Sequence, residues 1–182
     1  MRAFILETDR LLLRPPSAAD ISHFVPLIGD FDVTKNLSRV PHPYTEDDAC
    51  AFITASANGW ASGEDLPFSI LRKSDGALIG LCGVHPRQNW EIGYWLGKPY
   101  WGKGYASETA ARLVRFGFEE LGVARLLAEW FHDNPASGRV LEKVGFKPAG
   151  EKTSNCLARG GKVPAHAVAL DRADYMTRKK TP

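Results

Sequence analysis

The sequence has few cysteines, and neither its cysteines nor its histidines are spaced for a metal site. Cys50, Cys82 and Cys156 are an odd number, stand far apart and include no pair with CxxC spacing. The five histidines form no HExxH run. We therefore expect no disulfide framework and no metal site, and we interpret the thiols as reduced and the histidines as structural or surface residues.

Long apolar segments are lacking as well. No stretch of about 18 apolar residues is present, so no membrane-spanning helix is expected. The apolar residues 4–6 are too few for the core of a signal peptide. The longest uncharged run, residues 49–63, is interrupted by polar residues and indicates an amphipathic helix. These observations predict a cytoplasmic protein that binds no membrane.

An excess of charge of either sign is also missing. The chain has 23 Lys and Arg against 21 Asp and Glu, a net charge of +2, which does not favour a nucleic-acid partner. The basic residues 178–180 indicate a solvated terminus. With 182 residues, of which 44% are hydrophobic, the composition is typical of a globular protein. We expect one domain over residues 1–182 with a core of about 8–175, as a monomer or a homodimer.

Hydrophobic periodicity and turn residues predict a single sheet covered by helices. Ser17 with Asp20, and Thr45 with Asp48, have the spacing of a capping box and indicate two helix starts. Helices are expected at about 18–28, 46–60, 105–121 and 135–144, and strands at 11–14, 67–72, 77–85, 90–97, 125–131 and 163–171, with a further extended segment from 146. The short connections between 67 and 97 predict an antiparallel meander. The fold class is α+β, or mixed α/β.

Residues 94–107 suit the binding of a phosphate group. A strand leads through a glycine-containing loop into a helix, and the N–H groups and dipole of a helix start attract an anion. Gly102 and Gly104 permit close backbone approach, and Ala106 and Ser107 are small. No GxxxxGK[ST] run is present, and Ser107 occupies the third glycine position of a GxGxxG pattern. The spacing alone therefore favours a pyrophosphate site and an ordinary loop-to-helix turn equally.

Five motifs together resemble a known family. They are, in chain order, ETDRLLLR at 7–14, EIGYWL at 91–96, WGKGYA at 101–106, NPAS at 134–137 and EKVGF at 142–146. In this order the chain resembles the GNAT acyl-CoA-dependent N-acetyltransferases, in the branch of the ribosomal-protein N-terminal acetyltransferases. The resemblance implies a mostly antiparallel sheet that is splayed at an acetyl-CoA site. It also implies acetyl-CoA as co-substrate and a primary amine as acceptor, either a protein N-terminus or a small molecule.

The same resemblance assigns the residues that bind acetyl-CoA. Backbone N–H groups of the loop and the first helical turn hold the pyrophosphate, namely those of Gly102, Lys103, Gly104, Tyr105, Ala106 and Ser107. The strand ending at Trp95 and Leu96 diverges from its neighbour, the pantetheine arm lies in the gap, and the Leu96 N–H faces the thioester carbonyl. Asn134 binds the pantetheine amide and caps its helix. Trp101 stands where the family has Gln or Arg, and the Lys103 side chain fits a solvated loop position equally well.

Glu91 is the candidate general base. It matches the strand glutamate that serves as base in several GNAT enzymes, and strand alternation places it on one face with Gly93 and Trp95. The structural alternative is a carboxylate at the surface of the sheet.

Ser137 is the candidate that protonates the leaving thiolate. Many GNAT enzymes have a tyrosine acid seven residues after the asparagine that matches Asn134, and Leu141 occupies that position here. In the resembling branch a serine in the pattern NxxS takes this part, although Ser137 can equally serve only the first turn of its helix. The second glutamate of the ribosomal enzymes is missing as well. Glu151 is the nearest acid, and Cys156 occupies the matching position, so their mechanism does not transfer in full.

Two functions of different classes remain open at this point. The first is acetyl transfer from acetyl-CoA to an amine by direct attack, in which no cysteine acts as nucleophile and Cys82 is a core residue. The second is a non-catalytic acyl-CoA-binding sensor or partner module. The absent tyrosine favours the module, whereas the presence of both Glu91 and Ser137 favours the enzyme.

Overall fold

The computed structural model describes residues 4–86 and 89–180, and in this part of the chain eight strands form one sheet in the order β1-β2-β3-β4-β5-β6-β8-β7. The strands are β1 (Leu6–Glu7), β2 (Leu11–Arg14), β3 (Leu66–Arg72), β4 (Leu78–Pro86), β5 (Trp90–Leu96), β6 (Arg125–Phe131), β7 (Lys147–Cys156) and β8 (Gly161–Asp171). The longer helices are α1 (Ile21–Ile28), α3 (Glu46–Ser62), α4 (Tyr105–Arg115), α5 (Pro135–Val144) and α6 (Arg172–Lys180). Short helices are η1 (Ala18–Asp20), α2 (Phe31–Thr34), η2 (Lys98–Tyr100), η3 (Phe116–Glu120) and η4 (Leu157–Arg159). This arrangement confirms the predicted fold class.

The sheet divides between β5 and β6. Strands β2 to β5 form the predicted antiparallel meander. By contrast, β5 and β6 run parallel and pair only at Trp90–Leu126 and Glu91–Leu127. Beyond Glu91, β5 continues to Leu96 and β6 to Phe131, and the two strands no longer pair with each other. The structure therefore confirms that the sheet is splayed where the sequence predicts it.

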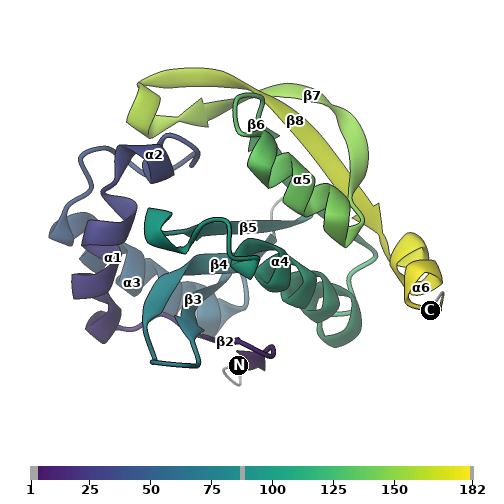
Figure 1. Cartoon of the computed structure of the whole chain (residues 1–182), viewed down its shortest axis with the longest axis horizontal. Helices are drawn as coiled ribbons and strands as arrows, with labels where there is room; N and C mark the ends of the chain where they lie inside the picture. Colours follow the sequence, from purple (N-terminus) through teal and green to yellow (C-terminus); the bar gives the residue numbers. More distant parts are fainter. Residues whose placement is uncertain (1–3, 87–88, 181–182) are drawn as a thin grey trace.

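Helices lie on both faces of the sheet and divide the molecule into two sides (Figure 1). On one face the Phe24 ring of α1 contacts both Phe52 of α3 and Trp95 of β5. On the other face α4 and α5 lie side by side, and the Tyr94 hydroxyl of β5 reaches Ser137 of α5. Because neighbouring strand residues point to opposite faces, the side chains of Tyr94 and Trp95 lie on opposite sides of the gap between β5 and β6.

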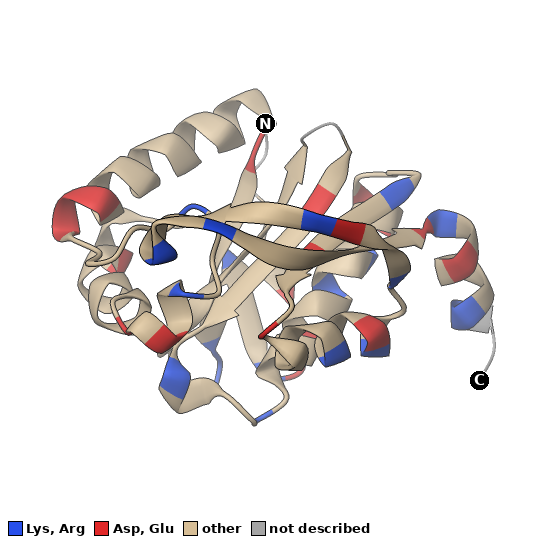
Figure 2. Ribbon diagram, turned by 90° about the horizontal axis from the view of Figure 1, so that it is seen from above, with Lys and Arg blue, Asp and Glu red and all other residues tan. Residues whose placement is uncertain are grey.

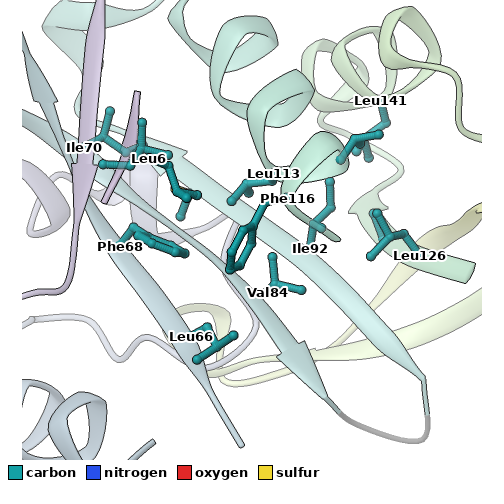
Figure 3. Packing of buried hydrophobic residues seen from close by; sticks show 14 of the residues in the cluster. Leu6, Leu66, Phe68, Ile70, Val84, Ile92, Leu113, Phe116, Leu126 and Leu141 are labelled. Carbon is teal, nitrogen blue, oxygen red and sulfur yellow. The ribbon is translucent and has the colours of Figure 1, made fainter. Parts of the chain in front are cut away.

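The main core lies between the sheet and α4. Figure 3 shows Leu113 and Phe116 pointing from α4 and the turn after it toward Val84 and Ile92 of the sheet. Phe116 also meets Phe68 edge to face, with ring centroids 5.6 Å apart. These apolar side chains recur at helical and strand spacing, and burying them fixes α4 against β5.

Both predicted capping boxes are formed. Thr45 and Asp48 exchange hydrogen bonds at the start of α3, and its acidic first turn complements the helix dipole (red, left in Figure 2). Ser17 and Asp20 do the same at η1, which leads into α1. Figure 2 also shows acidic and basic residues interspersed along α4, α5, α6 and the β7–β8 hairpin.

Asp20 does more than cap a helix, because it ties α1 to the sheet. The carboxylate is buried and accepts hydrogen bonds from Arg14, at 2.6 and 2.8 Å, and from the Ser69 hydroxyl at 2.8 Å. Burial raises the pKa of Asp20, but the bonds from Arg14, Ser17 and Ser69 outweigh it and hold the pKa below its ordinary value.

Asp20→Asn is expected to lower the free energy of unfolding by about 2–3 kcal/mol, because Arg14 loses its charged partner. A carboxyl with a lowered pKa stabilises the fold above its ordinary pKa and loses that contribution as the pH falls through its pKa in the fold. Urea unfolding of both forms at neutral and at acid pH measures this. The difference in free energy of unfolding between wild type and variant should shrink on acidification. A difference that does not change with pH would contradict a lowered pKa for Asp20.

Two segments differ from the sequence prediction. The helix from Tyr105 changes to a π-helical turn at Phe116–Glu120 and stops before Gly122. Arg178 and Lys179 are exposed, in agreement with the predicted solvated terminus, but they belong to the helix α6, which the sequence did not predict. Tyr175 of α6 stacks on Phe118 at 5.0 Å, and the Lys179 Nζ lies 2.6 Å from Glu119. One aromatic residue in a polar segment gives too little periodicity to predict such a docked helix.

Within the described residues, no helix is long and apolar enough to cross a membrane.

Candidate active site

A cavity of about 1070 Å3 lies where β5 and β6 diverge. All but one of the selected residues line it, namely Glu91, Trp95, Leu96, Gly102, Gly104, Tyr105, Ala106, Ser107, Asn134 and Ser137. The exception is Lys103, whose Nζ donates to the Pro99 carbonyl at 2.9 Å. The fold thus brings residues from three separate motifs to one cavity.

The N-terminus of α4 opens onto this cavity without a capping side chain of its own. Gly104 is the N-cap residue, so it has no side-chain oxygen like the one that Thr45 supplies to α3. Its φ of 82° lies in the left-handed region, which glycine adopts without strain. The first-turn N–H groups are therefore available to an anion, in line with the helix dipole.

Arg10, in the turn between β1 and β2, holds this loop in place. Its guanidinium donates to the Lys103 carbonyl at 3.0 Å, pairs with Glu108 at 2.6 Å and lies 4.6 Å from the centre of the Tyr105 ring. The Thr8 hydroxyl also donates to Glu108, at 2.6 Å. The ETDRLLLR motif thus fixes the start of α4.

The backbone of Leu96 faces the gap in the sheet. The next residue, Gly97, donates its N–H to Ile79 at 2.9 Å, on the β4 side. Since successive residues of a strand turn their N–H and C=O groups to opposite edges, those of Leu96 point to the β6 side. The Leu96 carbonyl accepts from Trp101 Nε1 at 2.8 Å. Trp101 is 43% exposed and forms part of the cavity wall.

Ser137 lies in the first turn of α5 and contacts a tyrosine that the sequence analysis did not select. Asn134 caps this helix, with its Oδ1 3.4 Å from the Ser137 N–H. The Ser137 Oγ lies 3.0 Å from the Tyr94 hydroxyl. Burial raises the pKa of Tyr94 to about 12, although the hydrogen bond with Ser137 acts in the opposite direction. Leu141, at the position of the family's tyrosine, is buried in the core.

Glu91 lies at the point where the sheet divides. It is the last residue of β5 that pairs with β6, opposite Leu127, and its partner on β4 is His85. It lines the cavity, and strand alternation places it on the Trp95 side, which faces α1.

A second carboxylate, Glu129 of β6, also lines the cavity and was not selected from the sequence. It accepts from Ser38 at 3.2 Å and from Ser154 at 2.9 Å, and it lies 2.6 Å from Lys152 Nζ. Burial raises the pKa of Glu129, but these partners, Lys152 above all, outweigh it and lower the pKa below its ordinary value. No local motif marks this cluster, because its members come from three separate segments.

The two residues considered for the missing second glutamate lie elsewhere. Glu151 is exposed and pairs with His166 at 3.2 Å. Cys156 is fully buried and its Sγ contacts the Lys35 carbonyl. Across residues 4–86 and 89–180, no group of three or more His, Cys, Asp or Glu is arranged to hold a metal ion.

The geometry points to a class of enzyme. A gap along one strand edge suits an extended ligand, and an uncapped helix start beside it suits the phosphates of that ligand. Hydroxyl and carboxylate groups line the same cavity. This combination fits the transfer of an acyl group from acyl-CoA.

Comparison with known proteins identifies the family. Residues 10–147 match the family model described as "Acetyltransferase (GNAT) domain". The chain therefore belongs to the GNAT family and is an acetyltransferase, and this family uses acetyl-CoA. The chain is 33% identical over 150 residues to the uncharacterized N-acetyltransferase YoaA of Bacillus subtilis (strain 168), covering 80% of this chain and 84% of that protein.

Solved structures show the same fold. The acetyltransferase (GNAT family) from Bacillus anthracis matches with a TM-score of 0.81 at 24% identity, covering 93% of this chain and 99% of that one. RimL, a ribosomal L7/L12 alpha-N-protein acetyltransferase in complex with coenzyme A, matches with a TM-score of 0.80 at 16% identity, covering 92% and 98%.

Proposed function

We propose that this chain acts as one N-acetyltransferase domain that moves the acetyl group of acetyl-CoA to a primary amine by direct attack on the thioester. The observation that carries the proposal is the convergence on one cavity of the gap in the sheet, the uncapped α4 start and the side chains of Glu91 and Ser137. The acceptor is the amine of a protein N-terminus or of a small molecule.

Acetyl-CoA binds along the divergent edge of β5. The N–H groups between Gly102 and Ser107 hold the pyrophosphate, and the pantetheine arm lies in the gap with Asn134 at its amide. The backbone of Leu96, which faces the gap, then stands beside the thioester and stabilises the oxyanion of the tetrahedral intermediate.

The amine enters from the α1 side of the sheet. There the aromatic rings of Phe24, Phe52 and Trp95 form an apolar wall, and Glu91 is the carboxylate base that fixes the ammonium group for loss of its proton. On the opposite face, the Ser137 hydroxyl donates to the sulfur as it gains negative charge. Tyr94 orients that hydroxyl through the 3.0 Å contact.

A thiol-release assay over a panel of primary amines tests the proposal. N-terminal peptides and small amines are compared with acetyl-CoA alone, and the acetylated product is identified by mass. An acyl-CoA-binding module would show a higher melting temperature with acetyl-CoA and no amine-dependent release of thiol. That outcome would replace the enzyme proposal.

Ser137→Ala is expected to lower kcat roughly 10–100-fold and to leave the affinity for acetyl-CoA nearly unchanged, because the hydroxyl matters most when the sulfur gains charge. Tyr94→Phe is the matched control, since it removes only the hydroxyl that holds Ser137. The loss of kcat in the double variant, Ser137→Ala with Tyr94→Phe, should be close to that in Ser137→Ala alone. Turnover of Ser137→Ala at the wild-type level would show that the thiolate leaves without this donor.

A further inference from the structure

A carboxylate–imidazole pair lines the same cavity and has no part in the function described so far. Asp65 follows α3, and His85 lies near the end of β4. The Asp65 carboxylate and His85 Nδ1 are in hydrogen-bond contact. This contact assigns the proton of the neutral ring to Nδ1, so Nε2 carries a lone pair that can accept a proton.

Two facing glycines make room for the imidazole ring. Gly83 of β4 and Gly93 of β5 are direct partners across the sheet. A Cβ on Gly83 would lie 2.7 Å from His85 Cε1 and 3.0 Å from Nε2, closer than real side chains approach. A Cβ on Gly93 would lie 3.6 Å from Nε2. The imidazole ring therefore lies across the glycine pair, with Nε2 over β5. The other edge of β5 borders the gap between β5 and β6.

The surroundings of His85 suit the uptake of a proton from an ammonium group. Glu91 is the direct partner of His85 on β5, so the two side chains project from neighbouring positions on one face. Besides Asp65, the titratable groups of Tyr44 and Glu129 line the same cavity. The His85 side chain is 19% exposed, which leaves a path for a proton to reach water.

We propose that His85, oriented by Asp65, is the catalytic residue that receives the proton of the acceptor amine. The proposal rests on the proposed function and refines the part of Glu91: the carboxylate fixes the ammonium group, and the imidazole takes its proton. Asp65 is a positioning residue, because it acts through the ring.

The step balances as follows. The ammonium ion gives one proton to Nε2, and its nitrogen lone pair then forms the C–N bond at the thioester carbonyl. Collapse of the tetrahedral intermediate breaks the C–S bond. The second proton of the former ammonium group ends on the thiol sulfur, and the amide nitrogen keeps the third. The imidazolium returns its proton to water, so one proton is released per turnover.

Chemical rescue tests this assignment in the full-length enzyme. His85→Ala is expected to lower kcat roughly 10–100-fold, less than a full general-base contribution because water can take some of the proton, with the KM for acetyl-CoA close to the wild-type value. Added imidazole should restore part of the rate, and more basic substituted imidazoles should restore more of it. Asp65→Asn should lower kcat, and His85→Ala with Asp65→Asn should be no slower than His85→Ala alone.

His23→Ala is the matched control, because His23 is exposed on α1, and its rate should respond neither to the substitution nor to imidazole. If His85→Ala does not fold, His85→Gln gives the same test, and wild-type turnover in it would overturn the assignment. Loss of rate in His85→Ala without rescue, with a lower melting temperature, would make His85 structural. A wild-type protein that binds acetyl-CoA but acetylates no amine would overturn the proposed transferase function. An active wild type with an equally active His85→Ala would overturn only the role of His85 as proton acceptor.

Discussion

Gly104→Val is expected to abolish the rise in melting temperature that acetyl-CoA produces. A ligand that binds only the folded state stabilises it by about 2.7 kcal/mol at 100 times its Kd, so the wild-type shift is readily measured. The φ of Gly104 is 82°, a region that a β-branched side chain adopts only with strain. Its Cβ would also lie 3.3 Å from Arg10 Nη2 and displace the contact that holds the loop. The backbone N–H groups that bind the pyrophosphate would then lose their alignment.

The measurement is thermal melting of each variant with and without acetyl-CoA, supported by calorimetry of binding. Gly104→Val melts earlier than wild type without ligand because of the strain, so the ligand-induced shift is the quantity compared. Gly161→Val is the matched control, since a Cβ at Gly161 meets nothing within 4 Å and its φ is not in the left-handed region. An undiminished shift in Gly104→Val would mean that the loop before α4 has another purpose.

Glu91→Gln is expected to lower kcat/KM about 100-fold or more near pH 7, because the variant loses the carboxylate that fixes the ammonium group for loss of its proton. At that pH most of a primary amine acceptor is protonated and needs the carboxylate. At about pH 9.5 an α-amino acceptor deprotonates by itself, so the variant should recover toward wild type. The swap retains the volume and most of the hydrogen-bonding capacity of the side chain.

The pH–rate profiles of the two forms are measured beside their thermal melts. A structural Glu91 would produce earlier melting with a loss of rate that does not depend on pH. A constant ratio of wild-type to variant kcat/KM across this pH range would refute the role of Glu91 in deprotonation of the ammonium group. The proton would then pass to His85 or to water without the help of this carboxylate.

Much of the fold follows from local signals in the sequence. The capping pairs at Thr45 and Ser17 each satisfy orphan N–H groups within four residues, so both helix starts are readable from the chain alone. Asn134 followed by Pro135 is equally local. The glycine at 104 and the small residues after it likewise predict the loop at α4, because a left-handed cap requires a residue without Cβ.

The partners of the site could not be predicted in the same way. Tyr94 and Ser137 are 43 residues apart, and Asp65 and His85 are 20 apart. Taken singly, each of these residue types is common in ordinary strands and loops. Only the pairing of Gly83 with Gly93, which follows from the register of β4 on β5, creates the space in which His85 lies.

The sequence by itself determined the order of the elements, the caps, the phosphate loop and the family, because each depends on residues close together in the chain or on motifs in a fixed order. The tertiary structure alone decided which side chains meet. It docked α6 through Tyr175, held Glu129 with Lys152, and placed His85 beside Glu91. The physical reason is that strand register and helix packing are set by burial of the whole core. A one-residue shift in strand register would turn strand residues such as His85, Glu129 and Lys152 to the other face.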